Sequence, residues 1–390
     1  MKDFSELIER IDALTVFRPL RNDEVFSAFY HYLTEPTVSN YADFLEKLYK
    51  KNGGYWSRYI KRICFFCENV VVKTASKGMM PTSFVFDALT EDLKTLQRIA
   101  DLTNEDLAPE NATVKPASFS TEEIALGKEY RDYLTHVGQR GYGIFAENAF
   151  FRLDGKTIVP VGTPDRVRLS DLIDYETERN AVVKNTLALL KGLPAANALL
   201  TGDAGTGKSS TIKAVANEYF SEGLRLVELK KEQLHLLPLV LETLGDNPLK
   251  FILFVDDLSF TMDDDDFNAL KAVLEGSVAA RTENVVIYAT SNRRHVVKER
   301  FSDREGDEVH RNDAMQELLS LSDRFGLRVS FFKPNKETYL NIVKTLADKA
   351  KLTIEEKDLF AQAERFALEQ GGRSARLARQ FIDSLLAKEE

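Results

Sequence analysis

Apolar residues recur along this chain with two different periods, and the change of period divides it into parts. Up to about residue 135 they recur every three or four positions, as in Leu7, Ile8, Ile11 and Leu14, and this period predicts amphipathic helices. Many of the apolar residues are aromatic, above all between Ala42 and Val72. Single helices would leave this surface in water, so we expect residues 1–140 to pack together as a helical N-terminal domain.

A strand-like pattern begins after residue 141. Two short apolar runs flank Asp154 and Gly155, and this dipeptide between two such runs indicates a β-hairpin. Pro160, Gly162 and Pro164 follow and are typical of a connecting segment. Residues 141–165 are therefore predicted to be a hairpin and a linker.

Strands and helices alternate from Arg166 onward. After a leading helical segment at residues 169–191, five apolar runs are separated by segments with a helical period. The five predicted strands are residues 197–201, 224–229, 251–255, 285–289 and 327–332. Alternation of this kind gives a parallel sheet with helices on both faces, so the fold class is α/β, with its core at residues 166–333. Three amphipathic helices at 334–390 form a small helical lid.

The turn after the first of these strands carries a phosphate-binding pattern. Residues 202–209 read GDAGTGKS and fit G-x-x-x-x-G-K-[ST] at every fixed position, between a strand and a helix. The glycines let backbone N–H groups turn toward phosphate oxygens, and the helix N-terminus adds partial positive charge. Lys208 is expected to reach the β and γ phosphates, and the Ser209 hydroxyl to bind Mg²⁺. The predicted nucleotide ligands in this loop are Asp203, Ala204, Gly205, Thr206, Gly207, Lys208, Ser209 and Ser210.

Polar residues follow two later strands, where α/β sheets place their ligands. Asp256 and Asp257 come directly after the third strand. Asp256 is predicted to hold Mg²⁺ together with Ser209, and Asp257 to polarise an attacking water; a helix-capping acidic pair is the alternative. Asn292 follows the fourth strand and is predicted to bind the γ-phosphate or the water, with a turn-forming role as its alternative.

Three arginines complete the predicted site. Arg324 lies at a predicted helix end before the fifth strand, where it could act in trans on a neighbouring subunit's nucleotide or offset the helix dipole. Arg373 and Arg376 are three residues apart at the start of the last predicted helix. One of them is expected to close over the γ-phosphate, and a solvated helix start is the alternative.

Taken together, the phosphate loop, the Asp-Asp strand, the Asn strand, the Arg helix end and the Gly-Arg lid resemble an AAA+ ATPase from Arg166 to the end of the chain. The stretches DDLSF, LKAVLEGSVAARTENVVIYATSNRRH and LSLSDRFGL also resemble a bacterial family of AAA+ ATP-binding proteins of unassigned function, and the similarity extends upstream to GYGIF and FFRLDG. The resemblance implies the five-stranded order of that superfamily, assembly into a ring or open oligomer, and positions near the adenine for Ile173 and Tyr175.

Two departures from the superfamily pattern shape the predicted function. Most AAA+ proteins have Asp-Glu where this chain has Asp256-Asp257, so turnover is expected to be slow; DNA replication initiators have a similar Asp-Asp pair. Residues 230–233 read KKEQ, without the aromatic loop that threads polypeptide. The resemblance therefore implies Mg²⁺-dependent ATP hydrolysis that remodels or loads a protein or nucleoprotein partner. The alternative is a nucleotide-gated binding module, similar to helicase loaders, with slow or no hydrolysis.

Composition and the remaining motifs limit the compartment, the partners and the class of nucleotide-binding protein. The 390 residues are 44% hydrophobic, carry a net charge of −9 and include two cysteines, with no apolar run long enough to span a bilayer and no signal-peptide pattern at the start. We expect a cytoplasmic protein, and a nucleic-acid partner has weak support. Cys64 and Cys67 are expected to be buried core thiols. A GTPase would carry N-K-x-D, and the nearest string, residues 335–338, lacks the Asp.

Three further groups of charged residues need an interpretation. Basic residues of the helical domain form either a ligand patch or a solvated helix face: Lys47, Lys50, Lys51, Arg58, Lys61 and Arg62. Arginines and lysines between residues 293 and 311 suggest a ring interface or a partner-binding insertion. Four aspartates at 263–266 are interpreted as N-terminal helix charge. An unidentified protein partner is expected to bind the N-terminal domain.

Overall fold

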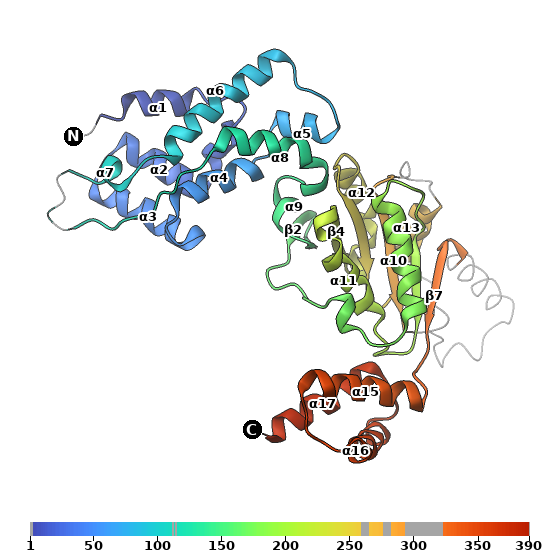
Figure 1. Cartoon of the computed structure of the whole chain (residues 1–390). Helices are drawn as coiled ribbons and strands as arrows, with labels where there is room; N and C mark the ends of the chain where they lie inside the picture. Colours follow the sequence, from blue (N-terminus) through green and yellow to red (C-terminus); the bar gives the residue numbers. More distant parts are fainter. Residues whose placement is uncertain are drawn as a thin grey trace. The chain divides into compact units, whose positions relative to one another are not determined.

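The computed structural model describes residues 3–110, 113, 115–258, 265–275, 282–292 and 323–389. The chain folds as two compact units, Met1–Glu147 and Asn148–Glu390 (Figure 1). Among the described helices, none combines the length and the apolar character needed to cross a membrane.

The first unit is entirely helical, as its three- to four-residue period predicts. Its helices are α1 Ser5–Asp12, α2 Glu24–Thr34, α3 Val38–Asn52, α4 Trp56–Phe66, α5 Val70–Ser76, α6 Ser83–Ala100, α7 Asn104–Leu107, α8 Leu126–Arg140 and α9 Ile144–Glu147. The core of this unit is built around aromatic rings. Trp56 is fully buried, and its ring centroid lies 4.8 Å from that of Phe29 and 5.1 Å from that of Phe44.

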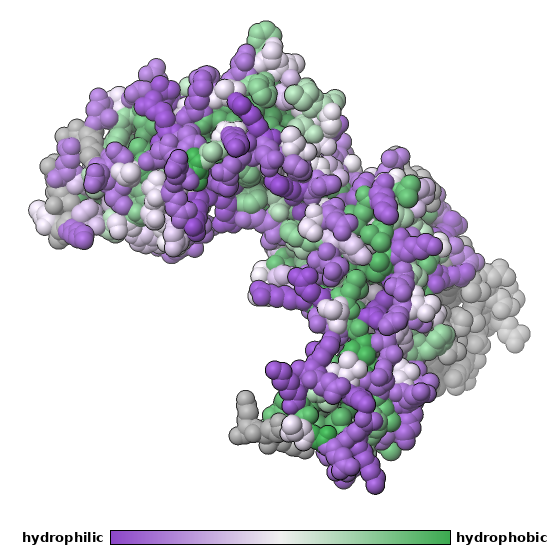
Figure 2. All heavy atoms as spheres, in the orientation of Figure 1, coloured by the Kyte–Doolittle hydropathy of each residue, from purple (hydrophilic) through white to green (hydrophobic). Residues whose placement is uncertain are grey.

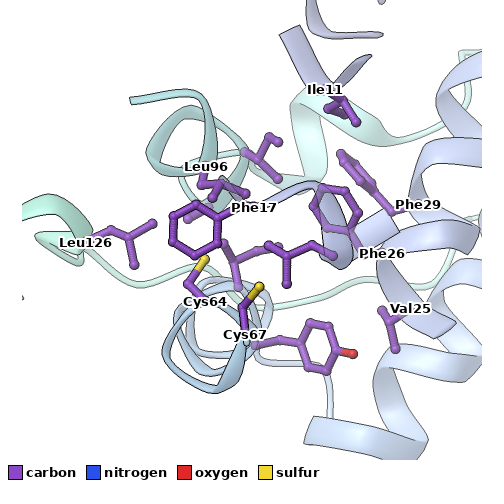
Figure 3. Packing of buried hydrophobic residues seen from close by; sticks show 14 of the residues in the cluster. Ile11, Phe17, Val25, Phe26, Phe29, Cys64, Cys67, Leu96 and Leu126 are labelled. Carbon is purple, nitrogen blue, oxygen red and sulfur yellow. The ribbon is translucent and has the colours of Figure 1, made fainter. Parts of the chain in front are cut away.

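The two cysteines belong to this core. Figure 3 shows Cys64 and Cys67 among Phe17, Leu96 and other apolar side chains. Both are free thiols, and burial raises the pKa of Cys67 to about 11 and that of Cys64 well above its ordinary value. Because both thiols are buried, the prediction of core thiols is confirmed. A thiol with a raised pKa is also a poor nucleophile at neutral pH.

The six basic residues of this unit that the sequence analysis named each pair with a carboxylate. The ion pairs are Lys47–Asp43, Lys50–Glu46, Lys51–Glu24, Arg58–Glu122, Lys61–Glu129 and Arg62–Glu147. On the face drawn in Figure 2, hydrophilic residues spread over much of the helical unit. Because each cation already has a carboxylate partner, these residues form a solvated, charge-balanced helix surface.

The side chain of Asp23 caps the N-terminus of helix α2. Oδ1 of Asp23 accepts hydrogen bonds from the backbone N–H of Val25 and Phe26, at 3.1 and 2.9 Å, and from the Tyr59 hydroxyl at 2.6 Å. We expect Asp23→Ala to lower the free energy of unfolding by about 1–2 kcal/mol. The measurement is chemical denaturation of the full chain followed by the fluorescence of Trp56, its single tryptophan.

Thr82→Ala is the matched control, because Thr82 precedes α6 but makes no capping hydrogen bond through its side chain. It should shift the same transition by less than about 0.5 kcal/mol. Equal effects of the two substitutions would contradict the assigned role of Asp23.

The second unit contains a seven-stranded sheet in the order β2-β1-β4-β5-β6-β3-β7. Its strands are β1 Phe150–Asp154, β2 Thr157–Pro160, β3 Ala198–Gly202, β4 Leu224–Leu229, β5 Lys250–Val255, β6 Val285–Ser291 and β7 Leu327–Phe331. The last five are the predicted parallel strands, and each neighbouring pair among them runs parallel. The predicted α/β class is confirmed.

The hairpin extends this sheet, which the sequence did not predict. Strands β1 and β2 pair antiparallel around Gly155, and β1 also pairs parallel with β4, with Phe150 opposite Leu226 and Arg152 opposite Glu228. Phe150 and Leu226 both contribute to the buried cluster of this sheet. In the described part of the chain, the predicted five-stranded sheet is thus seven-stranded, because β1 pairs with a strand 76 positions further along, from Phe150 to Leu226.

Helices cover the sheet and follow it. They are α10 Glu176–Leu190, α11 Lys208–Glu218, α12 Leu237–Gly245 and α13 Asp265–Leu274, and then α15 Lys336–Ala350, α16 Glu356–Glu369 and α17 Ala375–Glu389. The last three have a core of their own around Tyr339, Ile342 and Phe381, and they form the predicted lid, drawn in red in Figure 1. The predicted helix at 313–321 lies outside the described residues.

Candidate functional site

A cavity of about 960 Å³ lies in the second unit. Its walls are the loop after β3, residues 171–175 before α10, the residues after β5 and β6, and the lid helices α15 and α17. Most residues predicted from the phosphate-binding pattern and the strand ends line it: Ile173, Tyr175, Ala204, Gly205, Thr206, Gly207, Lys208, Ser209, Ser210, Asp256, Asp257, Asn292 and Arg376. Asp203, Arg324 and Arg373 are not among the lining residues.

Glycines are required in the loop after β3 for two physical reasons. Gly202 has φ +133°, and a Cβ there would lie 1.9 Å from the carbonyl oxygen of Phe331 in β7. Gly205 has φ +78°, and its Cβ would lie 3.1 Å from the Cβ of Arg376. The loop is therefore pressed between the sheet and the lid, and side chains at these positions would push it out of that space.

Lys208 lies inside this loop, at the start of α11. Its Nζ donates to the carbonyl oxygens of Gly202 and Asp203, at 2.9 and 2.7 Å, and to Oδ1 of Asn292 at 3.0 Å. Burial lowers the pKa of Lys208, and the carboxylates of Asp203, Asp256 and Asp257 oppose that effect. A cation held in this way, beside backbone N–H groups at a helix N-terminus, suits an anion such as phosphate.

Oxygen atoms gather next to the lysine. The hydroxyls of Ser209 and Thr290 both donate to Oδ1 of Asp256, at 2.7 and 2.5 Å. Oxygen ligands of this kind fit Mg²⁺, which usually retains several waters and binds through one or two protein groups plus phosphate. No group of three or more His, Cys, Asp or Glu side chains that could hold a metal occurs in the described part of the chain.

Asp257 and Asn292 form a second polar pair. Asp257 has a left-handed backbone with φ +52°, and its N–H donates to the Thr290 hydroxyl at 2.9 Å. Nδ2 of Asn292 donates to Oδ1 of Asp257 at 2.8 Å, while its Oδ1 accepts from Lys208. Asn292 therefore connects the lysine with the carboxylate. The hydrogen bonds of Thr290 to Asp256 and Asp257 were not predicted from the sequence.

The loop before α10 forms another wall of the cavity. The hydroxyl of Tyr175 donates to the carbonyl oxygen of Phe332 at 2.6 Å, and its ring lies 5.4 Å from that of Phe331. Burial raises the pKa of Tyr175 to about 12. Ile173 packs against the lid core. These two residues therefore line the cavity while joining the sheet and the lid.

The two lid arginines lie differently. The backbone N–H of Arg376 donates to the carbonyl oxygen of Gly205 at 3.2 Å, so the start of α17 touches the phosphate loop. Arg373 precedes α17 and forms two hydrogen bonds with Glu364 of α16, at 2.8 and 2.7 Å. Arg379 was not predicted as a site residue, but it lines the cavity together with Arg376.

Arg324 is not among the residues that line this cavity. Arg324 pairs with Glu275 at 2.9 Å, just after α13. Asp203 joins the loop to the segment after β7, since its Oδ2 accepts a hydrogen bond from the N–H of Lys333 at 3.2 Å. The arginines and lysines between 293 and 311, and Asp263 and Asp264, lie outside the described residues.

Comparison with known proteins identifies one family. The profile of a family described as "Protein of unknown function (DUF815)" matches residues 146–389. No curated protein matches the sequence.

Two solved structures are similar to this chain over a little more than half of its length. A Thermotoga maritima RuvB mutant is 14% identical, over 56% of this chain and 63% of that one, with a TM-score of 0.38. C. elegans PCH-2 is 17% identical, over 54% of this chain and 63% of that one, also with a TM-score of 0.38. The chain thus spans less than two thirds of either structure.

Proposed function

Since the chain belongs to the DUF815 family, whose function is unknown, we propose a function from its own site: it is an AAA+-type ATPase that binds and hydrolyses ATP with Mg²⁺. The carrying observation is the grouping of Lys208, Ser209, Asp256, Asp257 and Asn292 beside a glycine loop at the ends of β3, β5 and β6. A phosphate chain needs a cation, N–H donors and a metal anchor in one place, and this grouping offers all three.

Each residue of the group has a separate task in the proposed reaction. Lys208 and the loop N–H groups hold the β and γ phosphates, and Ser209 and Asp256 hold Mg²⁺. Mg²⁺, when bound, neutralises charge on the phosphate oxygens. Asp257 accepts a proton from the attacking water, and Asn292 orients that water or the γ-phosphate. Arg376 brings the lid against the phosphate loop.

The work proposed for this ATPase is remodelling or loading of a protein or nucleoprotein partner. The proposed assembly is a homo-oligomer, in which Arg324 serves a neighbouring subunit, and the helical unit binds the protein partner. Support for this part comes from the resemblance to AAA+ proteins and from the position of Arg324 outside the cavity lining of its own chain.

One observation favours a second candidate, a nucleotide-gated switch with little hydrolysis. The carboxylate of Asp257 already accepts a hydrogen bond from Asn292, so one of its oxygens is engaged before any water arrives. The two candidates differ in turnover, because a switch would bind ATP and hold it without appreciable release of phosphate.

The test is steady-state phosphate release by the full chain and by Asp257→Asn. We expect the wild-type chain to release phosphate. The variant should bind ATP with unchanged affinity but release phosphate about a hundredfold or more slowly, because the asparagine cannot take up the proton. Asp154→Asn, in the turn of the hairpin, is the matched control and should retain wild-type turnover. Tight ATP binding with no wild-type turnover would favour the switch, and equal turnover in the two proteins would contradict the role of Asp257.

A further inference from the structure

Thr290 is a buried residue that bonds to the acidic pair of the proposed site. It lies in β6 with 1% of its surface exposed, and it is not among the residues that line the cavity. Its hydroxyl donates to Oδ1 of Asp256 at 2.5 Å and accepts from the backbone N–H of Asp257 at 2.9 Å. Its carbonyl oxygen accepts from the N–H of Leu258 at 2.6 Å. One residue of β6 thus bonds to three consecutive residues that follow β5.

These bonds support a turn that does not continue the strand. Val255 is the last residue of β5 that pairs with β6, opposite Ala289. Asp257 then has φ +52°, a left-handed conformation that residues other than glycine keep only where their surroundings fix it. Because the N–H groups of Asp257 and Leu258 both donate to Thr290, this residue supplies that support.

The two carboxylate oxygens of Asp256 differ as a result. Oδ1 accepts from the hydroxyls of Ser209 and Thr290 and from the N–H of Asp257, at 2.7, 2.5 and 3.1 Å. Among the hydrogen bonds between described residues, none ends on Oδ2. Asp256 is exposed and lines the cavity, so Oδ2 is the oxygen that remains for a cation or for its bound water.

Packing of β6 alone does not require a hydroxyl at this position. Valine has nearly the same shape as threonine, is equally common in strands and buries no polar group. The Thr290 hydroxyl instead places its donor on one residue of the acidic pair and its acceptor on the other. Its bonds therefore indicate a role in arranging Asp256 and Asp257.

We propose that Thr290 is a positioning residue of the ATPase site: it occupies Oδ1 of Asp256, so that Oδ2 serves Mg²⁺, and it fixes the turn that brings Asp257 to Asn292. The inference rests on the proposed function, in which Asp256 holds the metal. Thr290 touches neither the nucleotide nor Mg²⁺ and acts through the acidic pair. Loss of its hydroxyl should therefore weaken metal-dependent binding of ATP and leave metal-free binding by Lys208 and the glycine loop unchanged.

The experiment measures ATP affinity by calorimetry, once with Mg²⁺ and once with EDTA, for the full chain and for Thr290→Val and Thr290→Ser. The ratio of the two affinities reports on the metal site, and in the wild type Mg²⁺ should tighten binding. Thr290→Val should lower the affinity measured with Mg²⁺ by about tenfold and leave the affinity in EDTA unchanged, because Asp256 loses a donor and the N–H of Asp257 loses its acceptor. Thr290→Ser retains the hydroxyl and should retain the wild-type ratio.

Thr186→Val is the matched control. The hydroxyl of Thr186 is also buried, and it bonds to the carbonyl oxygen of Val182 and to the hydroxyl of Tyr288, at 2.9 and 2.8 Å, but none of these residues lines the cavity. Chemical denaturation gives the stability of each variant, and the control should lose stability with no change in the affinity ratio. If Thr290→Val does not fold, Thr290→Ala replaces it, with the same expected loss, because it removes the hydroxyl without placing a methyl group against Asp256.

The outcomes separate this inference from the function on which it rests. Equal ratios in the wild type and in the variants without the Thr290 hydroxyl, or an equal loss in Thr290→Ser or in Thr186→Val, would overturn the positioning role and leave the ATPase proposal standing. Failure of the wild-type chain to bind ATP in either buffer would overturn both. Wild-type affinity that does not depend on Mg²⁺ would overturn the metal assignment of Asp256 and this role with it.

Discussion

Lys208→Ala should severely weaken ATP binding and, with it, hydrolysis. The ammonium is buried, and its three hydrogen bonds end on oxygens of Gly202, Asp203 and Asn292. Without it, the phosphate chain would face those carbonyl oxygens and the carboxylates of Asp256 and Asp257 with no side-chain cation between them. Truncating one member of a desolvated charge pair typically costs 2–5 kcal/mol, so we expect affinity to fall by roughly a hundredfold or more.

The measurement is titration of full-length wild-type and variant chains with ATP and Mg²⁺. Lys213→Ala is the matched control, since Lys213 lies in the same helix, α11, and does not line the cavity. It should retain wild-type affinity. Undiminished binding by Lys208→Ala would show that the glycine loop is not the phosphate site.

Arg324→Ala should retain ATP binding and lose turnover by about a thousandfold or more, the effect expected of an arginine that neutralises charge in the transition state. The arginine lies outside the cavity lining of its own chain, so the nucleotide it serves would belong to a neighbouring subunit. Glu275, its partner at 2.9 Å, would hold the guanidinium near the surface until a neighbour arrives.

Mixing separates action in trans from action in cis. Lys208→Ala supplies Arg324 but no nucleotide, and Arg324→Ala supplies nucleotide but no arginine, so turnover should partly return when the two inactive proteins are combined. Arg328→Ala, which removes a surface arginine paired with Asp323, is the control and should remain active alone. If turnover does not return on mixing, the trans role is wrong.

Local sequence was sufficient to locate the glycine loop after β3 and the ends of the strands. The glycine pattern constrains backbone angles directly, and apolar runs buried on both faces, such as β5, are distinct from their surroundings. Each run is followed within one or two residues by its polar group, so Asp256 and Asn292 could be assigned without knowledge of the strand order.

Contacts between distant segments could not be predicted in this way. Spacing alone placed Arg373 and Arg376 on one helix face, but α17 begins at Ala375, and Glu364 of another helix binds Arg373. Likewise, nothing near Thr290 in the sequence shows that its hydroxyl bonds to the residues after β5. Those bonds depend on the parallel pairing of β5 with β6.

The pairing of β1 with β4 has a practical consequence for any attempt to isolate the nucleotide-binding part. A chain shortened to start at Arg166 would keep every residue of the proposed phosphate site, yet it would remove the strand that is hydrogen-bonded to β4 and leave the backbone groups of β4 unpaired on that side. A fragment that begins at Asn148 keeps that neighbour. The hairpin therefore pairs backbone groups of β4 that would otherwise lie at an edge of the sheet, although it carries none of the proposed chemistry.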